Sequence, residues 1–357
     1  MNDNNPKINA GKKFNPDTII RILIRSTNWV GDAILTTPAI RAIRKNFPHS
    51  EITILAKPWV APVFEGNPHV DRIMIYDANN RHKGWLGRLR LISDIRKKKF
   101  GLAILFQNAF EAAIIAFVSR IPIRLGYDTD GRGLFLTHSV PGTHNAKFKD
   151  IHETDYYLGM LTPFGLTPDG SKLTLKISEP NHKSADKLLT GYGIGESDQI
   201  AGISPGATYG SAKRWLPERY AALADKIQEQ YGAHILIFGA PGEKQIGEKV
   251  TQLMKGSAIN LCGRTTLGEG IALINRCNLF ITNDSGLMHV AAALDTPLVA
   301  VFGPTNPHTT GPIGTKSKIV RIPVPCSPCL QPECATDHRC MKEISVEMVF
   351  DVVKTLV

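Results

Sequence analysis

Residues 279–305 read LFITNDSGLMHVAAALDTPLVAVFGPT, which is one strand, a polar loop, a helix and a second strand in succession. The runs LFIT and LVAVF are apolar throughout, as in strands that are buried on both faces. The helix between them carries small residues (VAAA), which allow it to pack close to its strand. A strand, a crossover helix and a second strand form a parallel pair. This stretch therefore predicts an α/β fold with a parallel sheet covered by helices.

The same alternation occurs earlier in the chain. Strand-like runs followed by helical patterns occur as IIRILIR (19–25), EITILA (51–56), LAILF (102–106), QIAGIS (199–204) and AHILIFG (233–239). The first helical pattern covers 33–46 and ends before Pro48, which cannot continue a helix. The alternation lapses at 132–153 and again at 167–180, and the second lapse has the composition of a link between two domains.

We predict two doubly wound, Rossmann-like domains that face a central cleft, one at 19–175 and one at 176–357. A polar lead-in at 1–18 is expected to be disordered. The second domain ends with a cysteine-rich segment at 326–340 and a terminal helix. In such sheets ligands bind beyond the carboxyl ends of the strands, so the functional residues should lie in the loops that follow each strand.

Composition limits the class of protein. The chain has 357 residues, a formal net charge of +10 and 43% hydrophobic residues. No apolar run reaches the roughly 20 residues that a membrane-spanning helix needs, and the first residues lack the apolar centre of a secretory signal, so we expect a soluble cytoplasmic protein. The positive charge favours anionic partners. The basic run 96–99 ends an amphipathic helix and has no interleaved aromatic residues, so nucleic acid is not indicated.

The loop 26–32 (STNWVGD) follows the first predicted strand, and Asp32 stands at the start of the helix after it. Asp is a common N-cap, and the spacing alone favours that role for Asp32. The alternative is a carboxylate general base at the floor of the cleft. One carboxylate can serve both roles through different oxygens.

Three loops in the second half have residues suited to the phosphate or ribose groups of a ligand. The loop 204–215 (SPGATYGSAKRW) offers hydroxyls, backbone amides and Lys213 ahead of a helix, without the glycine spacing of a Walker loop. In 238–243 (FGAPGE), Glu243 can accept from ribose hydroxyls or can be an ordinary first-turn acid. In 282–289 (TNDSGLMH), Asp284 and Ser285 can cap the following helix, and His289 lies one turn inside it, where a structural histidine is the common case.

Four cysteines lie close together near the C-terminus, at positions 326, 329, 334 and 340. Their spacing could serve a structural zinc or an iron–sulfur site, although it matches no standard finger or ferredoxin pattern. Reduced thiols and a labile disulfide are the alternatives. Cys262 and Cys277 lie in apolar surroundings and are expected to be buried.

Three ordered segments resemble glycosyltransferase family nine, the heptosyltransferases of lipopolysaccharide inner-core synthesis. They are RSTNWVGDAILTTPAIRAIRKNFP (25–48), SPGATYGSAKRWLPERYAALA (204–224) and ITNDSGLMHVAAALDTPLVAVFGPT (281–305). The resemblance implies an enzyme of GT-B fold with an N-terminal acceptor-binding domain and a C-terminal ADP-sugar-binding domain. It also implies transfer of L-glycero-D-manno-heptose from ADP-heptose to the first heptose of the inner core, with inversion and with no cofactor or catalytic metal.

The resemblance also assigns residues. Asp32 matches the family's catalytic carboxylate, which as general base would deprotonate the acceptor hydroxyl. Thr208, Lys213, Asp284, Ser285 and Gly286 match the family's donor-binding loops. Tyr209 stands in a variable part of its loop, and Glu243 and His289 are added as donor and ADP-binding candidates from their own loops. The implied acceptor is an anionic, Kdo-bearing lipid A core at the cytoplasmic face of the inner membrane, where the enzyme would bind peripherally. Candidate acceptor contacts are Arg124, Arg132 and Lys147.

Three other hypotheses remain at this point. The first is transfer to another core position by a relative of the same family, which adds the first or third heptose. The second is a nucleotide-dependent oxidoreductase or epimerase, but the cluster Gly191, Gly193 and Gly195 has the wrong spacing for a dinucleotide fingerprint and precedes a strand. The third is a basic nucleic-acid-binding or metal-sensing module that uses the cysteine cluster.

Overall fold

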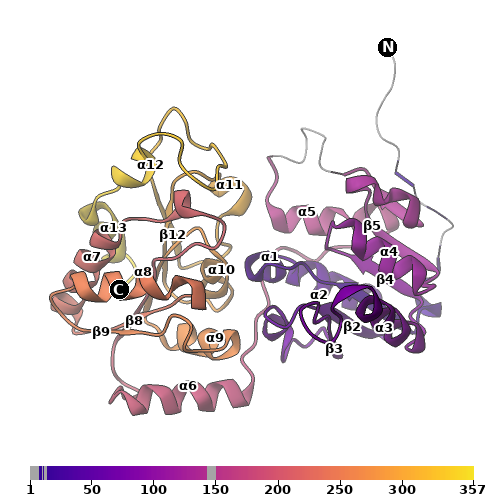
Figure 1. Ribbon diagram of the computed structural model, residues 1–357, viewed down its shortest axis with the longest axis horizontal. Coiled ribbons are helices and arrows are strands. Elements are labelled where there is room, and N and C mark those ends of the chain that lie inside the picture. Colours follow the sequence, from indigo (N-terminus) through magenta and orange to yellow (C-terminus); the bar gives the residue numbers. More distant parts are fainter. Residues whose placement is uncertain (1–7, 10, 12–13, 143–149) are drawn as a thin grey trace. The chain divides into compact units, whose positions relative to one another are not determined.

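The computed structural model describes residues 8–9, 11, 14–142 and 150–357, and the chain divides into two compact units, Met1–Lys176 and Ile177–Val357 (Figure 1). Each unit contains one six-stranded sheet in which every pair of neighbouring strands is parallel. The predicted α/β architecture with two doubly wound domains of the GT-B class is confirmed at the level of the fold.

Unit 1 has the strand order β3-β2-β1-β4-β5-β6, the order of a dinucleotide-binding sheet. Its strands are β1 (Arg21–Arg25), β2 (Glu51–Ala56), β3 (Arg72–Ile75), β4 (Leu102–Leu105), β5 (Ile123–Tyr127) and β6 (His138–Val140). Its α-helices are α1 (Val30–Leu35), α2 (Thr37–Asn46), α3 (Gly84–Lys97), α4 (Phe110–Val118) and α5 (Glu153–Gly159). Its short 3₁₀ helices are η1 (Pro16–Thr18), η2 (Ala61–Phe64), η3 (Thr129–Phe135) and η5 (Thr162–Phe164).

Unit 2 repeats this arrangement with the order β12-β11-β10-β7-β8-β9. Its strands are β7 (Ile200–Ser204), β8 (His234–Ile237), β9 (Ala258–Asn260), β10 (Leu279–Asn283), β11 (Leu298–Phe302) and β12 (Ser317–Arg321). Its α-helices are α6 (Glu179–Gly191), α7 (Pro217–Tyr231), α8 (Lys244–Leu253), α9 (Leu267–Arg276), α10 (Gly286–Ala293), α11 (Pro307–Thr310), α12 (Arg339–Lys342) and α13 (Val346–Val353). Two 3₁₀ turns, η6 (Ser211–Lys213) and η7 (Pro241–Glu243), lie in loops that follow strands.

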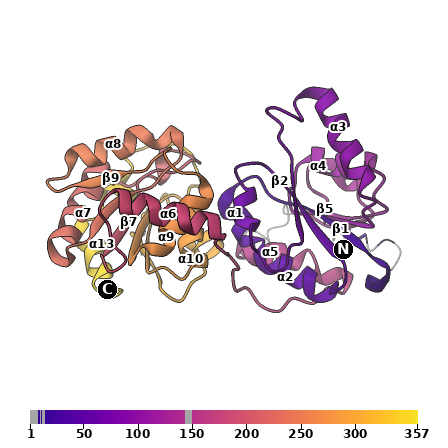
Figure 2. The ribbon, with the colours of Figure 1, turned by 90° about the horizontal axis from the view of Figure 1, so that it is seen from below.

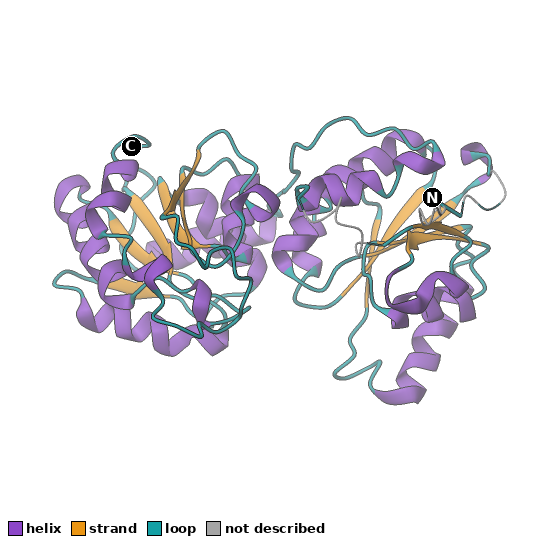
Figure 3. Ribbon diagram, turned by 90° about the horizontal axis from the view of Figure 1, so that it is seen from above, coloured by secondary structure: helices purple, strands orange, loops and turns teal. Residues whose placement is uncertain are grey.

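Helices flank the sheet of each unit (Figure 3). The central strands β7, β10 and β11 are buried along their whole length, which is why their sequences are continuous apolar runs rather than alternating ones. The edge strand β3 is partly exposed throughout. Gly202 of β7 leaves room for the ring of Phe280 on the neighbouring strand β10, because a Cβ at this position would lie 2.5 Å from that ring.

Two local features differ from the sequence-based expectations. The helix expected at 33–46 is two helices, α1 and α2, because the chain breaks at Thr36, and Pro38 stands in the first turn of α2. Proline is tolerated in a first turn, where no N–H is needed. The lead-in is also ordered in part, because Asn9 exchanges two backbone hydrogen bonds with Ser139 of β6 and Pro16–Thr18 form η1.

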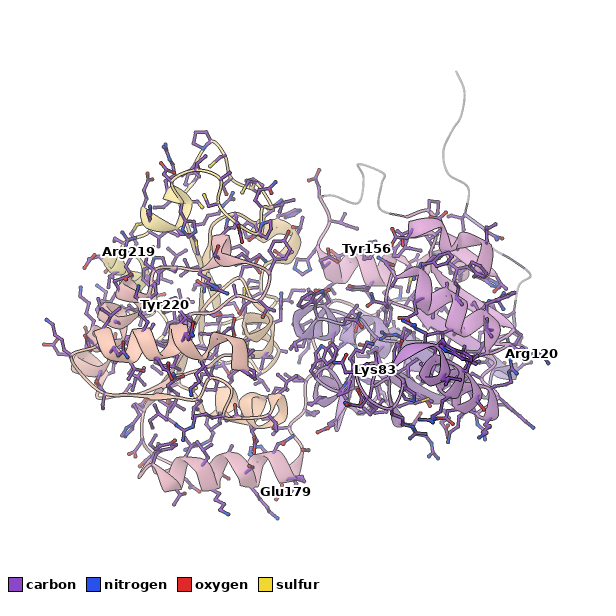
Figure 4. All side chains as sticks on the ribbon, in the orientation of Figure 1. Lys83, Arg120, Tyr156, Glu179, Arg219 and Tyr220 are labelled. Atoms are coloured by element: carbon purple, nitrogen blue, oxygen red, sulfur yellow. The ribbon has the colours of Figure 1, made fainter. Side chains whose placement is uncertain are left out.

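The side chain of Asn283, at the end of β10, connects this strand to the loop that follows β7. It is fully buried, and its Oδ1 accepts from the Trp215 backbone N–H at 2.9 Å and from the Tyr220 hydroxyl at 3.0 Å. Its Nδ2 donates to the carbonyls of Pro205 and Gly206 at 2.9 and 3.0 Å. Tyr220 belongs to α7 (Figure 4). One amide thus uses four hydrogen bonds to shape the loop 204–215.

We predict that Asn283→Ala lowers the free energy of unfolding of unit 2 by about 2–4 kcal/mol, because the buried groups that it pairs would lose their partners. Chemical denaturation measures this change. Asn306→Ala is the control, since the Asn306 side chain accepts one exposed bond at the start of α11 and its loss should cost about 1 kcal/mol or less. Equal losses in both variants would contradict the structural role of Asn283.

Candidate functional site

Asp32 lies in the first turn of α1, in the loop-to-helix turn that follows β1. The helix begins at Val30, and its N-cap is Trp29, which makes no side-chain capping bond. Asp32 is therefore inside the helix, and the interpretation of this residue as an N-cap is wrong. Its side chain is half-buried. The position at the carboxyl end of β1 is the one at which α/β sheets hold ligands.

A second carboxylate, Glu153 in the first turn of α5, interacts electrostatically with Asp32. Helices α1 and α5 are in contact. Burial and then the negative charge of Asp32 raise the pKa of Glu153 from its ordinary 4.5 to about 7. Tyr157, one turn further along α5, is also affected: burial first, then Asp32, raises the pKa of its hydroxyl well above the usual value. The two carboxylates therefore form an interacting pair, which their wide separation in the sequence had concealed.

A cluster of charged side chains also lies at the carboxyl edge of the unit 1 sheet. Arg25 ends β1, Lys57 follows β2 and Tyr76 follows β3. The Tyr76 hydroxyl and Arg88 Nε donate to the same oxygen of Glu111 at 2.8 and 2.6 Å, and Lys57 Nζ lies 3.6 Å from the centre of the Tyr76 ring. Burial, and then the charge of Arg25, lower the pKa of Lys57. No motif in the sequence indicates this cluster, although Lys57 directly follows the strand-like run 51–56.

None of the three cations expected to contact an acceptor is found in this cluster among the described residues. Arg132 is fully buried, and its guanidinium donates to the carbonyls of Tyr127 and Gln107 and to Asn108 Oδ1. This burial leaves Arg132 no surface for an acceptor, so its assignment is corrected to a structural one.

Arg124 is the second residue of β5, near the amino end of the strand, and its Nε donates to the Phe135 carbonyl at 2.6 Å. It therefore lies toward the edge of the sheet opposite to the loop of Asp32. Lys147 lies outside the described residues.

In unit 2, the loops after β7 and β10 meet through an ion pair. Lys213 Nζ lies 2.6 Å from Asp284 Oδ2, and the two side chains are 14% and 6% exposed. The ammonium of Lys213 also lies 5.0 Å from the centre of the exposed Tyr209 ring. Asp284 thus holds Lys213 and does not cap α10. Ser285 occupies the N-cap position, but its hydroxyl is hydrogen-bonded to that of Thr282 at 3.0 Å.

The remaining predicted donor residues lie around this pair. Thr208 is exposed on the same loop as Lys213, Gly286 begins α10, and His289 is buried one turn inside that helix. Glu243 accepts from the Ala240 backbone N–H at 2.8 Å, and it lies so close to Gly206 that a Cβ there would be 2.2 Å from a carboxylate oxygen. The loops after β7, β8 and β10 are therefore in contact at one edge of the sheet.

The cysteine-rich segment 326–340 packs directly against the loop that carries Lys213. The Tyr209 hydroxyl donates to the Leu330 carbonyl at 3.0 Å, and the Pro332 carbonyl accepts from the Ala212 N–H at 3.0 Å. His338 Nε2 lies 2.8 Å from the Ala212 carbonyl, which can only accept, so this ring nitrogen donates. The segment therefore supports the loop 204–215 through its main chain, a role that the sequence did not indicate.

The cysteines themselves differ in exposure. Cys326 and Cys329 are exposed, and Cys340 is buried, as are Cys262 and Cys277, in agreement with the expectation for the latter two. Within the residues that the structure describes, no group of three or more His, Cys, Asp or Glu side chains is arranged to hold a metal ion. A structural zinc at the cysteine cluster remains a prediction. In the same part of the chain, every helix is too short or too polar to cross a bilayer.

Comparison with known proteins extends over nearly the whole chain. The lipooligosaccharide heptosyltransferase 2 of Haemophilus influenzae is 30% identical over 318 residues, which cover 85% of this chain and 89% of that protein. The structure of E. coli ADP-heptose lps heptosyltransferase II superposes with a TM-score of 0.80 at 25% identity and covers 94% of this chain and 98% of its own. The resemblance to second heptosyltransferases is thereby confirmed.

The family assignment comes from two further comparisons. The crystal structure of the glycosyl transferase family 9 from Veillonella parvula superposes with a TM-score of 0.87 at 28% identity, covering 97% of this chain and 99% of that chain. The sequence profile described as "Glycosyltransferase family 9 (heptosyltransferase)" matches residues 88–339. Asp32 and the Lys213–Asp284 pair lie at the carboxyl edges of their sheets. The chain belongs to glycosyltransferase family 9, the heptosyltransferases.

Proposed function

We propose that this enzyme transfers L-glycero-D-manno-heptose from ADP-heptose to the first heptose of the lipopolysaccharide inner core. The observation that carries the proposal is the near full-length similarity to E. coli ADP-heptose lps heptosyltransferase II. The placement of a carboxylate in unit 1 and of a fixed cation in unit 2 supports it. The test is a panel of nucleotide sugars and core acceptors, with products identified by mass spectrometry. Exclusive use of another donor would refute the proposal.

Asp32 is the proposed general base. A sugar hydroxyl is a poor nucleophile, and a carboxylate that takes its proton as the new bond forms removes this barrier. The acceptor oxygen attacks C1 of the donor heptose, the bond from C1 to the ADP oxygen breaks, and the proton moves to Asp32. Attack from the side opposite to the leaving group inverts the anomeric centre. Glu153 holds a proton more tightly than an ordinary glutamate, which limits the negative charge beside the base near neutral pH.

Lys213 is the proposed partner of the donor diphosphate. Negative charge grows on ADP as the glycosidic bond breaks, so a cation that is already in place stabilises the transition state more than the ground state. The ion pair with Asp284 fixes the ammonium before the donor binds. The N-terminus of α10, which begins at Gly286, offers backbone N–H groups to the same anion. No resident metal enters this proposal.

The proposed acceptor is the phosphorylated, Kdo-bearing lipid A core, and it is anionic. Lys57 and Arg88 are better candidates for its recognition than Arg124 and Arg132, because they lie in the charged cluster at the carboxyl edge of the sheet. The acceptor is anchored in a bilayer, so we propose that the enzyme works at the cytoplasmic face of the inner membrane without spanning it.

We expect Asp32→Asn to lower kcat about 10²–10⁴-fold, the usual contribution of a general base, with unchanged ADP affinity. Steady-state kinetics and calorimetry with ADP measure the two quantities. Asp155→Asn, an exposed carboxylate on α5, is the matched control and should retain activity. Wild-type turnover in Asp32→Asn would remove Asp32 from this role and leave the sugar and acceptor assignments to be judged by the substrate panel.

Glu153→Gln should change stability in a pH-dependent manner. The folded-state pKa of Glu153, about 7, exceeds its ordinary 4.5, so the folded protein takes up a proton and the stability from this group is lost as pH rises through about 7. Glutamine cannot ionise. The variant should match the wild type at pH 4, where Glu153 is protonated in both states, and exceed it by about 1–3 kcal/mol at pH 8.

Denaturant titrations at both pH values check this result, and Glu179→Gln on α6 is the exposed control (Figure 4). A gap of the same size at both pH values would contradict the raised pKa of Glu153.

Gly210→Ala tests the support of the donor loop. A Cβ at Gly210 would lie 2.0 Å from the Pro332 carbonyl oxygen, so the loop and the cysteine-rich segment must separate. A strain of about 1–2 kcal/mol that displaces Lys213 should weaken ADP binding by about tenfold. Titration calorimetry with ADP measures the change. Gly191→Ala in α6 is the control, because a Cβ there meets no atom within 4 Å. Unchanged affinity would show that the loop tolerates the displacement.

A further inference from the structure

The largest part of the chain's net positive charge comes from one short segment around α3. Residues 81–99 contain eight Lys and Arg and one Asp, a formal net charge of +7 out of +10 for the whole chain. The cations are Arg81, Lys83, Arg88, Arg90, Arg96, Lys97, Lys98 and Lys99. Two of them form ion pairs with carboxylates in the described part of the chain, Arg81 with Asp94 and Arg88 with Glu111. The segment is therefore strongly basic even after pairing.

The same helix also exposes large apolar side chains. Leu91 and Ile95 are buried against unit 1, while Trp85, Leu86 and Leu89 are 69%, 63% and 50% exposed. The three exposed residues lie within one helical turn, on the side of α3 that faces away from Leu91. Figure 2 shows that α3 projects from unit 1 next to α4. Three neighbouring large apolar side chains on the exposed face of a helix are unfavourable in water, and such a patch indicates a binding surface.

Cations border this apolar group. Arg90 and Lys97 fall beside it on the outward side by helical spacing, and Lys83 is the N-cap of the helix (Figure 4). Arg96 Nη2 donates to the Val118 carbonyl at 2.6 Å, and the exposed Lys98 and Lys99 follow at the end of the helix. A row of apolar side chains edged by Lys and Arg is typical of helices that lie in the plane of a bilayer surface.

We propose that α3, through Trp85, Leu86, Leu89 and the bordering cations, is the element that docks this enzyme on an anionic lipid bilayer. The apolar side chains enter the region between headgroups and acyl chains, where tryptophan is favoured, and the cations contact lipid phosphates. Charge complementarity selects this partner, because a cytoplasmic leaflet is negative and each Lys or Arg near it contributes about 1 kcal/mol. Nucleic acid fits less well, since two of the three apolar residues are leucines with no face for stacking.

This surface of α3 binds lipid in the absence of substrates. The lipid-docking role of α3 rests on the proposed function in one respect, because the proposed acceptor is anchored in a membrane. Sedimentation with phosphatidylethanolamine vesicles, with and without phosphatidylglycerol and with neither donor nor acceptor present, therefore tests it separately. The expected result is binding to the anionic vesicles that falls steeply when ionic strength rises from about 0.1 to about 1 M, as the Debye length shrinks from about 10 to about 3 Å.

Two triple variants separate the two contributions. Arg90→Gln, Lys97→Gln and Lys98→Gln together should reduce the partition coefficient by about fivefold for each charge removed. Trp85→Ser, Leu86→Ser and Leu89→Ser together should reduce it by more than about tenfold and leave the salt dependence in place. The matched control for charge is Lys187→Gln, Lys255→Gln and Lys318→Gln, three exposed lysines of unit 2. All substituted side chains are exposed, and an unchanged Tm verifies folding.

The outcomes are distinct. Binding that the α3 variants lose and the control retains supports the proposal, whatever sugar the enzyme transfers. Equal binding to vesicles with and without phosphatidylglycerol, or wild-type binding by both α3 variants, overturns it. ADP binding by calorimetry should be the same in all of these variants. If the wild type does not bind ADP, the proposed function is refuted, and the result on vesicle binding by α3 still holds.

Discussion

In each unit all six strands run in the same direction, so the loop after every strand is delivered to the same edge of the sheet. This constraint explains why residues far apart in the sequence become neighbours. Asp32 follows β1, Lys57 follows β2, and the ion pair of unit 2 joins the loops after β7 and β10. The buried amide of Asn283 reinforces the arrangement, because it bonds the end of one central strand to the loop after its neighbour.

Electrostatics then distinguish the two edges. Unit 1 places two carboxylates close enough to interact, and one of them holds its proton to about pH 7. Unit 2 places a lysine against an aspartate in a nearly buried pair, where a fixed cation can meet an anionic group. A base needs a negative charge beside a hydroxyl, and a departing diphosphate needs a positive charge. The proposed chemistry assigns the base to the first edge and the diphosphate to the second.

The structure shows where the net positive charge of the chain lies. The overall value of +10 suits any anionic partner and says nothing of where that partner binds. The largest part of it comes from the segment around α3, a helix that is apolar both toward its own sheet and toward solvent. The cysteine-rich segment supports the loop 204–215 through backbone and ring contacts, and a metal bound by its cysteines stays a prediction.

The sequence by itself determined the fold class, the two-domain organisation of strands and helices, and the loops in which to look, because buried parallel strands leave continuous apolar runs and ligand loops follow them. Motif resemblance added the family. Only the tertiary structure decided the exact partners. The start of α1 at Val30 moved Asp32 from the cap into the helix, the burial of Arg132 removed it from the acceptor candidates, and the packing of α5 on α1 brought Glu153 to Asp32. These outcomes depend on contacts between segments remote in sequence, and no local pattern records them.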